Sequence, residues 1–161
     1  MAGCLVGCGA VIRNVEGLVM AASSPKMVAT FPLHIAEATA ILYGIQLAIN
    51  SGLNPVTVES DAAAVVDWIN GDIDLLSKVG TIFLDIKNLL HQIQCVVMTF
   101  VSRLANKVAR CLSKFCLSCD EDRFWLEEDP PCVRLLVLAE ASFQIVFVML
   151  CLFGLVILIK K

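Results

Sequence analysis

The segment Leu33-His-Ile-Ala-Glu37-Ala-Thr-Ala-Ile-Leu-Tyr-Gly-Ile-Gln-Leu-Ala-Ile-Asn50, followed by Val56-Thr-Val-Glu59-Ser-Asp61, decides the fold. The first part predicts a long, mostly apolar helix and the second a short strand. A carboxylate on an apolar helix is costly unless its charge is offset. Asp61, at the end of the strand, could share a divalent cation with Glu37, because carboxylate oxygens are ligands for such ions.

Each of the two acids also has a simpler interpretation. Asp61 stands where a side chain would cap the helix that follows the strand. Glu37 could be a carboxylate at the solvent edge of its helix, stabilised by the positive helix N-terminus, although that effect fades by the second turn. The residues alone leave both interpretations open.

The rest of the chain completes an α/β pattern. An antiparallel hairpin is expected near the N-terminus, with Gly17 in its turn. Apolar periodicity predicts further helices, and the order describes a single layered domain. The expected elements are strands at 9–13, 18–22, 56–59 and 94–101, a third short strand or loop at 27–31, and helices at 32–50, 62–69, 79–93 and 104–117.

Basic residues recur on the last of these helices at positions Arg103, Lys107, Arg110 and Lys114. A helix with this spacing places all four on one face. Such a stripe suits a phosphate backbone. The alternative is a solvated face with cations gathered toward a helix C-terminus.

The 58% apolar content is concentrated at the C-terminus, where residues 141–159 carry no charge. As a helix this run would be about 28 Å long, close to the thickness of a bilayer core. We therefore expect a candidate transmembrane helix at 141–159, with a terminal helix packed on the domain as the alternative. The N-terminus has no secretion signal, so the eight cysteines are expected to be reduced thiols rather than a disulfide or zinc framework.

Several motifs, in order along residues 7–140, resemble the ribonuclease H-like domain common in plant genomes, which is related to the ribonuclease H portion of retrotransposon reverse transcriptases. They are Gly7-x-Gly-Ala-Val-Ile-Arg-Asn14, Ala36-Glu37-Ala38, Val58-Glu-Ser-Asp61, Arg103-x-Ala-Asn106-x-x-Ala109, Trp125-Leu-Glu-Glu-x-Pro-Pro131 and Leu136-Val-Leu-Ala139.

The resemblance implies a five-stranded mixed sheet flanked by helices, and cleavage of the RNA strand of RNA–DNA hybrids by two Mg²⁺ ions held by four carboxylates. By position, Glu37 and Asp61 would be catalytic metal ligands. Arg103, Asn106, Lys107 and Lys114 would bind the nucleic acid.

Two departures affect the expected activity. The family's first Asp, on an N-terminal strand, is absent, so we expect that strand to be largely missing. The fourth carboxylate position holds Arg110, whose guanidinium could pair with Asp61 or Glu37 in place of metal. Mg²⁺ binding is therefore doubtful, and hydrolysis is expected to be impaired.

The expected organisation is a ribonuclease H-like domain at 1–119, an acidic linker with the family's C-terminal tail at 120–140, and the candidate transmembrane helix at 141–159. The expected partner is an RNA–DNA hybrid or RNA, with no small-molecule substrate. The alternative is a membrane-tethered, non-catalytic remnant of a transposon-derived gene. We expect the domain to face the cytosol if 141–159 enters a membrane, and otherwise to be cytoplasmic or nuclear.

Overall fold

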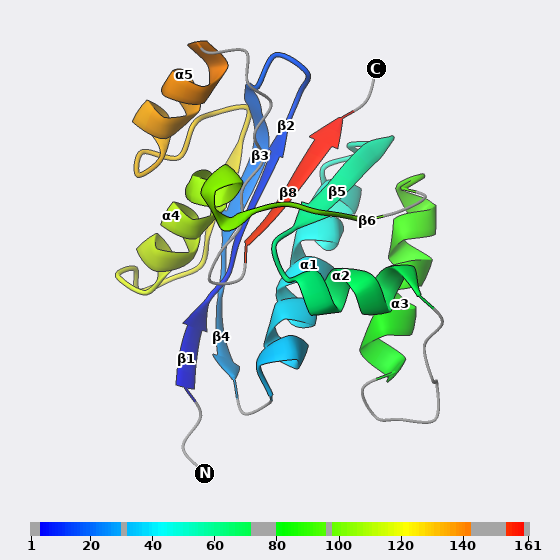
Figure 1. The fold of residues 1–161 in the computed structure, drawn as a ribbon. Helices are drawn as coiled ribbons and strands as arrows, with labels where there is room; N and C mark the ends of the chain where they lie inside the picture. The colour runs from blue at the N-terminus through cyan, green and yellow to red at the C-terminus, as the bar shows by residue number, and fades with distance from the viewer. Residues whose placement is uncertain (1–3, 30–31, 72–79, 96–97, 143–153, 160–161) are drawn as a thin grey trace.

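The computed structural model describes residues 4–29, 32–71, 80–95, 98–142 and 154–159. They form a central mixed sheet with helices on both faces, together with a separate two-stranded ribbon (Figure 1). The predicted α/β class and mixed sheet are therefore confirmed. The strands are β1 (Cys4–Gly7), β2 (Gly9–Arg13), β3 (Val19–Ser24), β4 (Lys26–Ala29), β5 (Val56–Ser60), β6 (Met98–Phe100), β7 (Arg123–Leu126) and β8 (Gly154–Ile159). The helices are α1 (Leu33–Asn50), α2 (Ala63–Asn70), α3 (Gly80–Gln92), the 3₁₀ turn η1 (Arg103–Asn106), α4 (Lys107–Cys116) and α5 (Arg134–Ser142).

The main sheet has six strands in the order β6-β5-β8-β2-β3-β7, while β1 pairs with β4 outside it. The predicted hairpin is present as β2 and β3. Gly17 has a φ of 81°, and the Asn14 side-chain oxygen accepts hydrogen bonds from the amides of Glu16 and Leu18. These features fix the turn.

The position between β2 and β5 is filled by β8, from the far end of the sequence (Figure 1). This strand runs parallel to β2 and antiparallel to β5. The expected helix over 141–159 is therefore wrong for residues 154–159, while residues 143–153 lie outside the described part of the chain. Nowhere in the described ranges is there a helix with the length and apolar character needed to cross a bilayer.

The two faces of the sheet carry separate apolar cores. On one face, α1, α2 and α3 pack against β2 and β5 around a cluster that includes Ile12, Ile41 and Val58. On the other face, α4 and the residues around α5 pack against β2 and β3 around Val11 and Leu112. Figure 1 shows α4 and α5 on the opposite side of the sheet from α1, α2 and α3.

The Gly7-x-Gly9 pattern is explained by the close approach of α4 to the start of β2. A Cβ atom on Gly9 would lie 2.3 Å from the carbonyl oxygen of Ala109, and one on Gly7 would overlap the carbonyl oxygen of Ser113. Any side chain at these positions would force the helix away from the sheet.

Residues 120–140, expected to be an acidic linker and tail, contribute to the domain in the structure. β7 pairs with β3 at the edge of the sheet. Val133, just before α5, and Val137 on α5 are buried in the core that α4 also lines. This stretch is therefore attached to the domain through β7 and these two valines, although most of its residues are exposed.

Candidate functional site

Asp61 follows β5 directly, and its side chain turns away from the helix that comes next. The Ser60 hydroxyl oxygen accepts a hydrogen bond from the Ala62 amide at 3.2 Å. The cap position of α2 is Ala62, which supplies no side-chain cap. Asp61 is therefore not the helix cap that the sequence left open as an alternative.

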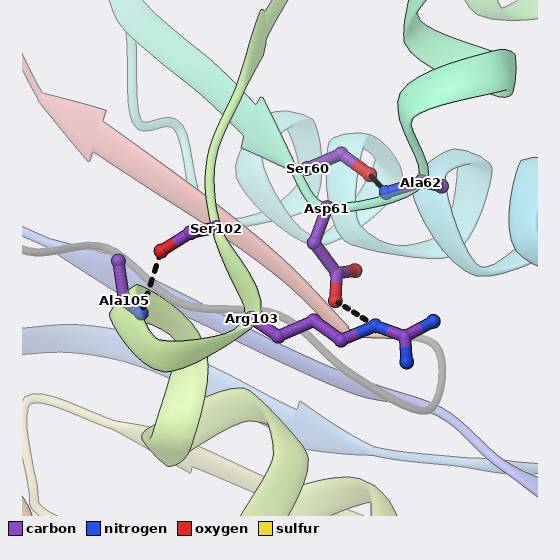
Figure 2. A network of polar contacts seen from close by, with 6 residues as sticks. All are labelled: Ser60, Asp61, Ala62, Ser102, Arg103 and Ala105. Atoms are coloured by element: carbon purple, nitrogen blue, oxygen red, sulfur yellow. Dashed lines mark hydrogen bonds and ion pairs between the residues drawn. The ribbon is translucent and has the colours of Figure 1, made fainter.

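The Asp61 carboxylate instead faces Arg103, as Figure 2 shows. Nε of Arg103 lies 3.8 Å from Oδ2 of Asp61. The Asp61 side chain is only 8% exposed, whereas that of Arg103 is 76% exposed. A nearly buried carboxylate is thus partnered by a cation that still reaches solvent.

Glu37 lies in the second turn of α1 and is half-buried. Burial, and next the charge of Asp61, raise the pKa of the Glu37 carboxyl above its ordinary value, while Arg103 lowers it. Glu37 is therefore close enough to both groups for their charges to affect its protonation. The structure brings together the two acids that the sequence singled out.

Arg103 takes this position because the predicted helix at 104–117 begins later than expected. The Ser102 hydroxyl oxygen accepts a hydrogen bond from the Ala105 amide and caps the 3₁₀ turn η1, and α4 begins only at Lys107. A 3₁₀ turn has three residues per turn, so Arg103 does not continue the helical spacing of the residues after it. Leu104, in the same 3₁₀ turn, is 80% exposed.

The other predicted binding residues follow Arg103 in order. Lys107 and Lys114 on α4 are exposed and Arg110 is half-buried. Asn106 ends η1, and its side chain lies outside what the structure describes. Arg110 makes no ion pair with Asp61 or Glu37 within the described residues. The guanidinium that faces Asp61 belongs to Arg103, so the expected pairing by Arg110 is wrong.

The residues gathered here do not fit a two-ion metal centre. Two carboxylates against one guanidinium leave a single net negative charge. Mg²⁺ usually keeps carboxylate support and gives up its water reluctantly. Across the described ranges, no group of three or more His, Cys, Asp or Glu side chains is placed to hold a metal ion. If a divalent cation binds, Glu37 and Asp61 are the residues that would hold it.

Glu59, two residues before Asp61 in the chain, is a further acid that the sequence analysis did not single out. Glu59 on β5 is half-buried, and burial raises the pKa of its carboxyl. Val58 packs on the α1 side of the sheet, so alternation along the strand places Glu59 on the α4 side. The alternation in Val56-Thr-Val-Glu59-Ser60 is the sequence pattern from which the side of the sheet that carries Glu59 could have been predicted.

An aromatic pair, His34 and Trp68, involves the same helix as Glu37. Their ring centroids are 5.3 Å apart with nearly perpendicular planes. Residues three apart on a helix share a face, so His34 lies one turn from Glu37 on α1. Spacing gave no sign of this pairing, because Trp68 comes from a different helix.

Comparison with known proteins agrees with the architecture and with the motifs that lie within residues 5–116. The model of the reverse transcriptase-like family matches residues 5–116, well over half of the chain. No curated protein matches the sequence. The matched range contains β2, α1, β5, Asp61, Arg103 and the whole of α4. The chain therefore belongs to the reverse transcriptase-like family, and its domain is ribonuclease H-like.

Proposed function

We propose that this chain is a nucleic-acid-binding ribonuclease H-like domain that recognises an RNA–DNA hybrid or RNA, and that its hydrolysis of the RNA strand is impaired. The observation that carries the proposal is the ion pair between Arg103 and Asp61, together with the nearby Glu37. This ion pair supports a role in phosphate binding, and it also argues against tight binding of two metal ions at the acids.

The binding half of the proposal rests on exposed cations. The Arg103 side chain is mostly exposed even though its Nε faces Asp61. Lys107 and Lys114 are exposed on the helix that follows. Family resemblance makes a hybrid the expected ligand, recognised by shape, phosphates and 2′-hydroxyl groups.

The impairment half rests on charge. Two-metal hydrolysis needs carboxylates that hold both ions while water attacks the phosphate. Here a guanidinium already faces one of the two acids, and Arg110 stands where the family has another carboxylate. We assign Glu37 and Asp61 the metal-facing and catalytic positions by resemblance, but derive no hydrolytic step from them.

The test measures binding and cleavage of a labelled hybrid separately. Binding should persist in EDTA and weaken steeply with salt. Changing Arg103, Lys107 and Lys114 together to Gln should reduce the slope of log affinity against log salt by about three, roughly one per lost phosphate contact. Arg134→Gln removes one positive charge at an exposed position on α5, outside the proposed binding residues, and as the control should leave the slope nearly unchanged.

Cleavage should be absent or slow with Mg²⁺. Fast cleavage that Glu37→Gln abolishes would refute the impairment. Failure to bind any hybrid or RNA at low salt would refute the binding role.

The alternative of a membrane-tethered remnant rests on the apolar sequence at 141–159. In the structure, β8 pairs with β2 on one side and β5 on the other, and insertion into a bilayer would break both pairings. Membrane fractionation of the full chain and of a chain ending at residue 140 tests this alternative.

A further inference from the structure

Trp68 is a partly exposed aromatic side chain whose position is restrained by contacts with two other rings. It lies on α2 and is 44% exposed. Its ring meets Phe83, which is buried in the core, at 5.8 Å with an interplanar angle of 87°. It also meets His34 at 5.3 Å and 86°. These edge-to-face contacts restrain the indole while nearly half of it stays in water.

This aromatic pair comes from the helix that carries Glu37 and the helix that follows Asp61. His34 shares a face of α1 with Glu37, one turn away. Trp68 is on the helix that starts two residues after Asp61. His34 therefore shares α1 with Glu37, Trp68 lies on the helix that follows Asp61, and the two rings are in contact.

The charges nearby suit a nucleotide. Arg103 faces Asp61 and is mostly exposed, so a phosphate can reach its guanidinium. Binding of a phosphate alone would leave the exposed indole of Trp68 without a role, whereas a base could stack on it. Proteins that bind single strands combine cations along the backbone with aromatic rings on which bases stack.

We propose that Trp68, supported by His34, is a stacking platform for an unpaired base, so that the domain prefers nucleic acid with a single-stranded segment beside the Arg103–Asp61 pair. The inference rests on the proposed nucleic-acid binding and specifies its substrate class. A paired base inside a continuous duplex has both faces covered by its neighbours and cannot use the platform.

The experiment compares three ligands with the full chain: a blunt hybrid, the same hybrid with a four-nucleotide single-stranded extension, and the same extension built from abasic residues. The abasic version keeps the phosphates and removes only the bases. We expect the extension with bases to bind more tightly than the abasic extension by roughly 5- to 150-fold, the range for loss of one stacked base.

Trp68→Leu should remove this difference, whereas Trp68→Phe should retain part of it. Phe124→Leu, which changes an exposed aromatic residue on the edge strand β7, is the matched control and should retain it fully. Thermal melts of each variant separate loss of the platform from loss of the fold. In a Trp125→Phe background, Trp68 is the only tryptophan, and its fluorescence should change with the base-bearing extension alone.

Equal binding of the base-bearing and abasic extensions by the wild-type chain would overturn the platform while leaving the proposed function intact. A difference that survives in folded Trp68→Leu would overturn it as well. Absence of binding to all three ligands would instead refute the proposed function itself.

Discussion

Replacing Ile157 by proline tests whether β8 is the central strand of the sheet. Ile157 is in register with Ile12 of β2 and with Val58 of β5, and both partners are fully buried. Proline has no amide hydrogen and fixes φ near −65°, so it removes a hydrogen bond and disturbs strand geometry. Because the strand is paired on both sides, a neighbouring carbonyl loses its donor whichever way the amide points.

The size of the effect follows from burial. A buried carbonyl left without a partner costs roughly 1–3 kcal/mol, and a proline within regular structure costs roughly 3 kcal/mol or more. For a chain of this length each kcal/mol lowers the melting temperature by roughly 2–4 °C. Ile157→Pro should therefore lower it by at least about 6–12 °C.

Ile157→Val is the matched control, since it keeps the backbone donor and should cost only about 0.5–1.5 kcal/mol. Thermal melts followed by circular dichroism measure both variants. Hydrogen exchange should also speed up at the amides of β2 and β5 in the proline variant. A proline variant that melts within about 2 °C of the valine variant would show that β8 does not lie between β2 and β5.

Three further substitutions test the packing around the sheet, each read by urea unfolding. Gly9→Ala should destabilise by roughly 1–3 kcal/mol or more, because its Cβ would meet the Ala109 carbonyl; a neutral result would refute the close approach of α4. Asn70→Ala should cost roughly 1–3 kcal/mol, since the Asn70 amide group bonds both the N–H and the carbonyl of Met98; an unchanged unfolding midpoint would contradict these bonds. Burial raises the pKa of Cys8 from 9.0 to about 12, so folding stability should fall by about 1.4 kcal/mol per pH unit between those values. Cys8→Ala should flatten that fall, and an unchanged slope would contradict the assignment.

The elements with a clear period were predictable from sequence. The helix from Pro32 to Asn50 and the strand that ends before Asp61 occur within a residue or two of their expected bounds. Since α1 and β5 contribute side chains to the same apolar core, the helix that carries Glu37 lies on one face of the sheet whose strand β5 ends just before Asp61. The local spacing of apolar residues was sufficient to predict those elements that pack through one apolar face.

The C-terminal strand could not be predicted because a uniformly apolar run has no period. Residues 141–159 match a bilayer-spanning helix in composition, and a strand buried on both sides has the same composition. Only the pairing with β2 and β5 distinguishes the two for residues 154–159. That pairing is long-range information which the run itself does not contain.

The sequence predicted the wrong arginine beside Asp61 for a different reason. Arg110 was expected there because it occupies the position of the family's fourth carboxylate. In the structure the Ser102 cap produces a 3₁₀ turn before α4 and directs Arg103 to Asp61. Serine is a residue type that favours helix caps, so Ser102 marked the start of this helical segment in the sequence. The regular spacing of the basic residues suggested instead that one helix ran from Arg103 onward.

The three charged groups of the site link nucleic-acid binding to protonation. Burial and the charge of Asp61 raise the pKa of Glu37, and Arg103 offsets part of that rise. A phosphate that engages Arg103 reduces this offset, so the pKa of Glu37 should rise further and binding should take up a proton. Hybrid affinity is then highest at low pH and falls as pH rises through the raised pKa of Glu37, above its ordinary value of 4.5. Affinity measured across pH tests this, with Glu37→Gln as the variant that should lose the dependence. A pH profile that is identical in the two proteins would show that Arg103 binds phosphate without changing the acid pair, or does not bind it at all.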